Sequence, residues 1–433
     1  MFFLPETITQ TLTKTKKMIN VFYDSYRILF LVYSDGAFLK QAMSDVFIEE
    51  KNRAHTTKIC YGVLDRDVEF EYVFSKLCDK RPKQAVRIIL KIAMYSIKYL
   101  KTAPYAVVDA AVELIKKLGK GGTSGFVNAF LRKYVSYKMA EPSDETQRLS
   151  VKYSYPIFAV KRLCSDYGKE TAEKIMGADS EMTTVRFNSS VNGEEYLEDK
   201  RWIYEKTPFF NTFFVKGFKR DSDFDKGIYT FQSIGSVAIC DMVGNGNALL
   251  DACAAPGGKS VNLADKFNTV TSFELHGHRV ELIKDYARRM NKTNITAVCK
   301  DSSIYDEEYS EKFDAVLCDV PCSGYGVVKD NPDIKLRRTE GDVEKISETQ
   351  LKILETCSHY VKRGGYLYYS TCSVFKSENE SVCLEFLRKH ADFAECETEP
   401  KLNHLKMKAG VSFLPDLSFG AGFYFCKFKK SEK

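Results

Sequence analysis

Two cysteines lie in short motifs whose neighbouring residues could support chemistry. Cys322 stands in "CDVPCSGYG", directly after a proline and three residues after Asp319, and Cys372 stands between two hydroxyl residues in "YYSTCSV". A thiolate is a strong nucleophile, and a partly buried carboxyl group can hold a proton. Each thiol therefore has three interpretations: a metal ligand, a small hydrophobic residue of the core, or a nucleophile.

The metal interpretation requires ligands that the sequence does not supply. A zinc site at Cys318 and Cys322 would need two further ligands, and no second pair of cysteines or Cys/His pair has suitable spacing. The sequence therefore predicts no metal site. The 13 cysteines lack regular spacing, which is typical of reduced thiols. Cys318, Cys299 and Cys357 fall on apolar strand or helix faces, where a free cysteine usually fills the core.

Strands and helices alternate from Ala248 onward, and they must position both motifs. This alternation predicts a doubly wound, mostly parallel sheet, in which ligands bind at the carboxyl ends of the strands. The segment "AGFYFCKFKK" alternates in polarity and predicts an antiparallel edge strand. The predicted parallel strands are "ALLDAC", "TVTSFEL", "ITAVCK", "FDAVLCDV" and "GYLYYSTC".

A glycine-rich turn, "DACAAPGGKS", follows the first of these strands and resembles a phosphate-binding loop. Such a loop needs a glycine five positions before Gly258, so that backbone amides can surround the phosphates. Cys253 occupies that position, and Pro256 removes one amide donor from the turn. These residues argue against a nucleotide triphosphatase.

Acidic residues at the next strand ends favour an adenosine cofactor. Glu274 is placed to accept hydrogen bonds from both ribose hydroxyls, and Asp301 could accept one from the adenine amino group. The G-x-G-x-x-G motif of dinucleotide enzymes is missing, which argues against a nicotinamide cofactor. S-adenosylmethionine fits this pattern, because its sulfonium can lie near a glycine turn and it has no diphosphate to bind.

The N-terminal third of the chain is helical and basic. Residues 20–138 show apolar positions at spacings of three and four, with short breaks between the helices. Residues 1–140 carry 23 Lys and Arg against 13 Asp and Glu, a surplus of ten, whereas the remainder carries 41 against 45. This surplus predicts attraction to a polyanion, first of all nucleic acid, and a solvated basic surface is the alternative.

Three domains follow from these patterns. Residues 1–140 are expected to form an all-helical RNA-binding domain, 141–235 a linker and small α+β connector, and 236–433 the catalytic domain. The connector begins with the polar stretch "KMAEPSDETQRLS", one helix over 157–178 follows, and strands are expected over 183–232. The N-terminus lacks a signal-peptide core and no apolar run could span a bilayer, so a soluble, cytoplasmic monomer without membrane contact is expected.

Three long motifs resemble those of the RNA cytosine-C5 methyltransferases. They are "LLDACAAPGGKS", "CDVPCSGYGVVKDNPDIK" and "YYSTCSVFKSENE", and the resemblance, which covers nearly the whole chain, is closest to the bacterial enzymes of small-subunit ribosomal RNA. The segment "APYAVVDAAVELIKKLGKGGTSGFVNAFLRK" is similar to the last helices of their antitermination-factor-like RNA-binding domain. The resemblance implies a Rossmann-like S-adenosylmethionine methyltransferase sheet, preceded by that domain and by the connector. Two segments depart from the family pattern: "FQSIGS", which keeps only Gln232 and Ser236, and "GAGF".

The chemistry that this resemblance implies needs one nucleophile, one acid and one base. A thiolate that adds to C6 of cytosine makes C5 nucleophilic, an acid acts near N3, and a base removes the C5 proton after methyl transfer. In the family, the Thr-Cys-Ser motif supplies the nucleophile, which implies attack by Cys372, release by Cys322 and an acid role for Asp319. DNA cytosine methyltransferases use the Pro-Cys thiol for attack, which would nominate Cys322 instead. The cofactor contacts implied are Cys253, Ala254, Ala255, Pro256, Gly257, Gly258, Lys259, Glu274, Asp301 and Asp319.

The resemblance leaves the target and some surface roles open. Small-subunit (16S) ribosomal RNA is the expected partner, and the same chemistry on tRNA or large-subunit RNA is an alternative. A non-catalytic RNA-binding or assembly factor is a second alternative, although both thiols and Asp319 are present. Lys329, Asp333 and Lys335, which follow the Pro-Cys motif, are expected either to grip the RNA backbone or to form a solvated loop.

Overall fold

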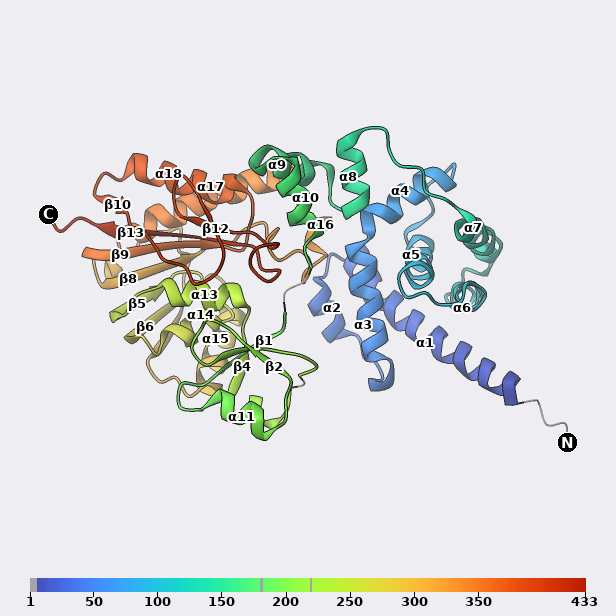
Figure 1. Ribbon diagram of the computed structural model, residues 1–433, viewed down its shortest axis with the longest axis horizontal. Helices are drawn as coiled ribbons and strands as arrows, with labels where there is room; N and C mark the ends of the chain where they lie inside the picture. Colours follow the sequence, from blue (N-terminus) through green and yellow to red (C-terminus); the bar gives the residue numbers. More distant parts are fainter. Residues whose placement is uncertain (1–5, 180–181, 219) are drawn as a thin grey trace. The chain divides into compact units, whose positions relative to one another are not determined.

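The computed structural model describes residues 6–179, 182–218 and 220–433, and it divides the chain into two compact units (Figure 1). One unit comprises Met1–Lys161 and Asn331–Arg337, and the other comprises Arg162–Asp330 and Arg338–Lys433. We call them the helical unit and the sheet unit. The three-domain division predicted from the sequence, with a separate connector over 141–235, stays a prediction.

The helical unit is a bundle whose apolar stripes pack into one continuous core. Ile88, Ile89 and Ile92 of α5 are fully buried in it. Helix α6 begins with a proline at its first position, where no backbone N–H is needed. The helices are α1 (Glu6–Ser34), α2 (Leu39–Asp45), α3 (Glu50–Asp65), α4 (Asp67–Leu77), α5 (Gln84–Lys98), α6 (Pro104–Lys117), α7 (Ser124–Ser136) and α8 (Glu145–Tyr153), with the 3-10 turn η1 (Gly121–Thr123).

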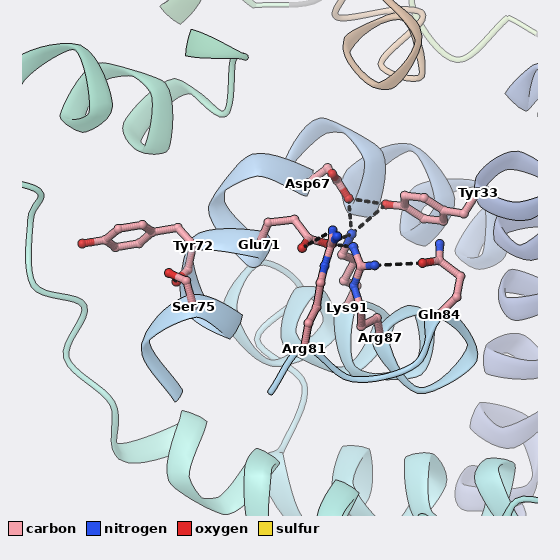
Figure 2. A network of polar contacts seen from close by, with 9 residues as sticks. All are labelled: Tyr33, Asp67, Glu71, Tyr72, Ser75, Arg81, Gln84, Arg87 and Lys91. Carbon is pink, nitrogen blue, oxygen red and sulfur yellow. Dashed lines mark hydrogen bonds and ion pairs between the residues drawn. The ribbon is translucent and has the colours of Figure 1, made fainter. Parts of the chain in front are cut away.

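A network of buried charges joins α1, α4 and α5 inside this bundle (Figure 2). Lys91, of which 1% is exposed, contacts the carboxylates of Asp67 and Glu71, the latter at 2.7 Å. Tyr33 donates a hydrogen bond to Asp67, and Arg87 pairs with Glu71. Burial would raise the pKa of Glu71, but Lys91 and Arg87 beside it lower that pKa to about 2. The charges are therefore balanced within the core.

The segment Asn331–Arg337 belongs to the helical unit although it follows the Pro-Cys motif in sequence. The Lys335 Nζ donates to the backbone oxygen of Asp65 at 2.6 Å and to its carboxylate at 2.9 Å. Asp333 accepts a hydrogen bond from the amide of Leu39 at 3.3 Å. Asp333 and Lys335 are both buried, so the sequence expectation of an RNA-gripping or solvated loop is wrong for these two residues. Their charges are satisfied inside the unit. The segment contains the short helix α16 (Ile334–Arg337).

The sheet unit contains a nine-stranded mixed sheet in the order β11-β12-β13-β9-β8-β5-β6-β7, with β10 paired to β13. The pairs from β9 to β7 are parallel, and chain order reverses between β8 and β5, where the crevice of a doubly wound sheet opens. This confirms the predicted fold class. The strands are β5 (Gly246–Asp251), β6 (Phe267–Glu274), β7 (Ile295–Cys299), β8 (Phe313–Asp319), β9 (Val361–Thr371), β10 (Phe393–Glu395), β11 (Leu405–Lys406), β12 (Val411–Phe413) and β13 (Phe423–Lys430).

Strand β13 is antiparallel, as predicted, but it is not an edge strand. It pairs with β9 along one side and with β12 and β10 along the other. The short strands β10 to β12 lie in sequence that gives little alternation, so the sequence did not reveal the partners that cover β13. The expectation of an edge is therefore wrong.

Helices cover both faces of the sheet (Figure 1). Neighbouring residues of β5 point to opposite faces: Leu249 packs in the core with α13 and α14, and Leu250 in the core with α17 and α18. Both faces of the central strands are therefore buried, which explains their continuous apolar runs. The elements are α13 (Ile234–Met242), α14 (Gly258–Leu263), α15 (Gly277–Arg289), α17 (Glu340–Ser358) and α18 (Glu380–Lys389), with the 3-10 turns η2 (Glu307–Tyr309) and η3 (Lys376–Glu378).

A second, four-stranded antiparallel sheet with the order β2-β3-β1-β4 also lies in the sheet unit. The single helix expected over 157–178 is two helices, because Gly168 between them has a φ of +76°. The elements are α9 (Ile157–Tyr167), α10 (Lys169–Gly177), β1 (Thr184–Phe187), α11 (Gly193–Asp199), β2 (Tyr204–Lys206), β3 (Thr212–Val215), α12 (Ser222–Asp225) and β4 (Tyr229–Phe231). Within the described residues, no helix is both long enough and apolar enough to cross a membrane.

Candidate active site

The structure brings the two motif cysteines into contact. Strands β8 and β9 are parallel neighbours, with Asp319 opposite Ser370, so the loops that follow them begin side by side. The Sγ atoms of Cys322 and Cys372 are 3.1 Å apart. Cys322 and Cys372 are both partly exposed. We call these two residues the thiol pair.

The loop of Cys322 is fastened to that of Cys372 at Gly326. The amide of Gly326 donates to the backbone oxygen of Cys372 at 2.9 Å. A Cβ at position 326 would lie 2.0 Å from the backbone oxygen of Gly422 and 2.7 Å from that of Cys372. Only glycine permits this approach of three chain segments, so the thiol separation depends on it.

The hydrogen bond between the thiols changes the acidity of Cys322. Contact with Cys372 and burial together raise the pKa of the Cys322 thiol well above its ordinary value. Cys322 therefore keeps its proton at neutral pH. Cys318 and Cys357 are buried, as expected, whereas Cys299, at the end of β7, is exposed and the expectation that it lies on an apolar face is wrong.

Asp319, at the end of β8, is held from two sides. The Lys259 Nζ contacts its Oδ2 at 2.6 Å, and the Ser370 hydroxyl donates to its Oδ1 at 2.7 Å. Burial would lower the pKa of Lys259, but Asp319 beside it raises that pKa above its ordinary value. The carboxylate and ammonium thus form a fixed ion pair at the strand ends.

A cavity of about 200 Å³ opens between the glycine turn and Asp319. We call it the strand-end cavity. Gly257 turns the chain with a φ of +105°, which a residue with a Cβ would adopt only under strain. The sequence-predicted residues in the cavity wall are Cys253, Ala254, Ala255, Pro256, Gly258, Lys259 and Asp319.

Glu274 and Asp301 lie outside this wall, at the ends of β6 and β7. Glu274 is buried and accepts hydrogen bonds from the amide of His276 at 3.1 Å and from Arg279 at 3.2 Å. Arg279 also donates to the backbone oxygen of Ala255 at 3.2 Å, which links Glu274 to the glycine turn. A hydrogen bond from the Ser303 amide lowers the pKa of Asp301.

Sequence reasoning missed Asp251, which ends β5 and lines the cavity. Its Oδ2 accepts a hydrogen bond from Ser260 at 2.6 Å, and its buried Oδ1 has no partner among the described residues. Burial raises the pKa of Asp251 to about 6. Its strand-end position, shared with Glu274 and Asp319, was the signal that could have identified it. Phe231, Ser233 and Tyr286 also line the cavity and carried no such signal.

The residues of the cavity fit an amino-acid-bearing cation. The unpartnered oxygen of Asp251 can accept hydrogen bonds from an ammonium group, and the tight turn leaves room beside the Gly258 backbone. Gln232, retained in "FQSIGS", donates to the Gly258 oxygen at 3.2 Å and so supports the turn. S-adenosylmethionine has an ammonium and a sulfonium, the groups that Asp251 and the turn suit.

Comparison with known proteins decides the family. The model of the 16S rRNA methyltransferase RsmB/F family matches residues 240–429, and that of the NusB family matches residues 25–136. The probable ribosomal RNA small subunit methyltransferase B of Bacillus subtilis (strain 168) is 31% identical over 420 residues, which cover 90% of this chain and 94% of that protein. The chain belongs to the RsmB/F family.

As an RsmB/F member, the chain is an S-adenosylmethionine-dependent methyltransferase with a NusB-like N-terminal domain, which confirms the predicted cofactor and class of enzyme. The crystal structure of PH0851 has the same fold, with a TM-score of 0.81 and 23% identity over 96% of this chain and 98% of that one. A methyltransferase homolog protein from Pyrococcus horikoshii matches with a TM-score of 0.55 and 23% identity over 67% of this chain and 100% of that one.

Proposed function

We propose that this RsmB/F protein transfers a methyl group to C5 of a cytosine in 16S ribosomal RNA through a covalent adduct between Cys372 and C6. The observation that carries the proposal is the thiol pair, with its Sγ atoms 3.1 Å apart and the Lys259–Asp319 ion pair at the same strand ends. When bound, S-adenosylmethionine supplies an electrophilic methyl group. The protein's task is to make C5 nucleophilic and then to restore the base.

Cys372 is the nucleophile in this proposal. The raised pKa of Cys322 keeps a proton on that thiol, which can donate its hydrogen bond to the Cys372 sulfur. Cys372, whose sulfur accepts that hydrogen bond, is therefore assigned the attack on C6. Asp319 is assigned to N3: during attack N3 takes a proton that the Lys259 ammonium supplies through Asp319, and the proton returns to this pair when the adduct breaks down.

Cys322 acts later, in release. Once Cys372 is bonded to C6 it is a thioether, and the contact that most strongly held the proton on Cys322 is lost. Cys322, which is partly exposed, can then lose its proton to solvent, and the resulting thiolate takes the C5 proton. The electrons of the C5–H bond re-form the C5=C6 double bond, and those of the C6–S bond return to Cys372.

The remaining site residues are assigned to the cofactor. Asp251 would hold the ammonium, Glu274 the ribose hydroxyls and Asp301 the adenine amino group. The glycine turn, with the predicted residues 253–259, would lie against the methionine part. Asp319 lines the strand-end cavity as well, which supports its predicted contact with both cofactor and base.

The RNA target follows from the family and from charge. The matching family is described by its 16S rRNA activity, and the basic surplus of residues 1–140 suits a phosphate backbone. We place the reaction in the cytoplasm, on the assembling small subunit or its RNA, with the protein acting as a monomer.

Replacing each cysteine by alanine tests the proposal. We expect Cys372→Ala to abolish methyl transfer without forming an adduct, and Cys322→Ala to accumulate a covalent protein–RNA complex that migrates slowly on a denaturing gel. Cys396→Ala, a partly exposed cysteine directly after β10, is the matched control and should retain activity. Exchanged phenotypes would reverse the roles of the thiols.

The target is tested by bisulfite sequencing of ribosomal RNA from a deletion strain. Loss of one protected cytosine in 16S RNA is expected, with recovery on complementation by the wild-type gene and not by Cys372→Ala. An unchanged 16S RNA together with a lost signal in tRNA or 23S RNA would move the same chemistry to that RNA.

A further inference from the structure

A buried carboxylate contacts both of the loops that carry the thiol pair. Glu378 ends the turn η3, and its side chain is fully buried. It belongs to the "FKSENE" stretch after Cys372, to which neither attack nor release assigns a task. Burying a carboxylate without partners destabilises the fold, so Glu378 must be satisfied by hydrogen bonds. The residues that donate these bonds indicate its role.

Glu378 contacts the residue that follows each cysteine. The backbone amide of Ser323, which follows Cys322, donates to its Oε1 at 2.6 Å, and the Ser323 hydroxyl donates to its Oε2 at 2.5 Å. The hydroxyl of Ser373, which follows Cys372, donates to the same Oε2 at 2.5 Å. One carboxylate thus joins two loops that are 50 residues apart in sequence.

A third element completes this arrangement. Gln350 of α17 donates from its Nε2 to the Glu378 Oε1 at 3.3 Å and to the backbone oxygen of Pro321 at 2.9 Å. Pro321 directly precedes Cys322, so the Cys322 loop is held on both sides of the thiol. The Tyr369 hydroxyl donates to the backbone oxygen of Glu378 at 2.6 Å and fixes the turn on β9. We call Glu378 with Ser323, Ser373 and Gln350 the carboxylate bridge.

The contacts of the carboxylate bridge indicate a positioning role and not a chemical one. Glu378 is fully buried and does not line the strand-end cavity, so it does not contribute to the proposed cofactor site. In the described part of the chain, all groups that donate hydrogen bonds to the Glu378 carboxylate are neutral. Ser323 and Ser373 lie in the two thiol loops, and Gln350 also contacts the Cys322 loop at Pro321. Charge-assisted bonds of this kind are short and directional, which suits them to fix two loops in register.

We propose that Glu378 is a positioning residue that holds Cys322 and Cys372 in thiol contact, and that methyl transfer and release require this contact. The catalytic part of the inference rests on the proposed function, whereas the thiol contact itself does not. An amide at this position offers one acceptor oxygen in place of two, so Glu378→Gln must lose or weaken part of the bridge. The two loops would then separate.

The first measurement is chemical and independent of methyl transfer. Diamide takes two electrons and two protons from a pair of thiols, which become a disulfide, and the rate depends on the distance between the sulfurs. Treating the full-length protein with diamide and digesting it should give the Cys322–Cys372 disulfide by mass spectrometry. We expect its rate of formation to fall about tenfold or more in Glu378→Gln, as expected for loss of a fixed near-contact geometry.

The second measurement is the methyl transfer rate. A displacement of about 1 Å at a reacting group can cost about 100-fold, so we expect kcat of Glu378→Gln to fall by about that factor with KM for RNA little changed. Glu380→Gln is the matched control, because Glu380 is also buried and two residues away but accepts its hydrogen bond from the Lys408 amide at 3.0 Å. It should match the wild type in both assays.

A milder variant covers the case in which Glu378→Gln does not fold. Ser373→Ala removes a single hydroxyl of the bridge, and we expect it to slow both disulfide formation and kcat in the same direction. Wild-type rates of disulfide formation in Ser373→Ala, or in a folded Glu378→Gln protein, would overturn the proposal. Methyl transfer that survives Cys372→Ala while Glu378→Gln still slows disulfide formation would refute the proposed function and leave the bridge standing.

Discussion

The carboxylates of the charge network in the helical unit have cation partners, whereas two fully buried carboxylates of the sheet unit have none in the described part of the chain. In the helical unit, Glu71 and Asp67 contact the buried ammonium of Lys91, and the network is complete within the bundle (Figure 2). In the sheet unit, Asp251 and Glu378 are fully buried and accept hydrogen bonds from neutral serine hydroxyls. Their hydrogen-bond donors in the described residues are neutral groups, whereas the buried Glu274 of the same unit pairs with Arg279.

The difference separates a scaffold from a working site. The pKa of Glu71 is lowered to about 2 by its cations, whereas that of Asp251 is raised to about 6 by burial. The balanced ion network joins three helices and requires no ligand to neutralise its charges. The buried carboxylate of Asp251, with one unpartnered oxygen, can instead bind a positively charged ligand. Changes of pH and substitutions can test this contrast between Glu71 and Asp251.

Removing Lys91 should have the largest effect on stability. Lys91→Met leaves the buried Asp67 carboxylate without its cation, while Glu71 keeps Arg81 and Arg87, and breaking a buried ion pair typically costs about 3–5 kcal/mol. We expect hydrogen-exchange protection of the α5 amides in the full-length protein to fall by that amount. Lys116→Met is the matched control, because Lys116 pairs with Glu113 on the surface with half of each side chain exposed, and it should change protection by less than about 0.5 kcal/mol. Equal effects of the two variants would contradict the contrast.

Acid should destabilise the helical unit through Glu71. Its pKa in the fold, about 2, is lower than its ordinary value of 4.5, so its contribution is fully present above pH 4.5 and is lost as the pH falls toward 2. The difference corresponds to at most about 3.5 kcal/mol, because one pKa unit is about 1.4 kcal/mol and solvent screens the partly exposed Glu71. Hydrogen exchange or circular dichroism between pH 5 and pH 2 measures this loss. Glu71→Gln should remove most of this dependence of stability on pH. An unchanged pH dependence in Glu71→Gln would show that another group is responsible.

The pH dependence expected from Asp251 has the opposite sign to that from Glu71, and the expected effect is smaller. Its pKa in the fold, about 6, is higher than its ordinary value of 3.8, so protonation favours the free protein as the pH falls through 6. A cationic ligand needs the ionised form, and we expect the Kd for S-adenosylmethionine to rise about tenfold between pH 7.5 and pH 5. Isothermal titration measures it. Asp251→Asn should bind weakly at both pH values, and an unchanged pH dependence in that variant would remove Asp251 from the ligand site.

Most elements of the sheet unit could be predicted because their signals are local. Apolar runs such as "FDAVLCDV" and "GYLYYSTC" became β8 and β9, and parallel pairing then placed Cys322 near Cys372. For two of the wrong predictions, the missing information was pairing. Strand β13 has partners on both sides from short segments with little alternation, and Lys335 pairs with Asp65, 270 residues away.

The sequence by itself determined which residues could act and in which kind of fold, because periodicity, turn chemistry and long motifs are properties of neighbouring residues. Tertiary structure alone decided how close the thiols lie, that Glu378 joins their loops, and that Asp251 has an unpartnered oxygen in the strand-end cavity. Each of these depends on contacts between segments far apart in the chain. Such contacts arise only when the sheet pairs, and no local pattern encodes a distance of 3.1 Å between two sulfurs.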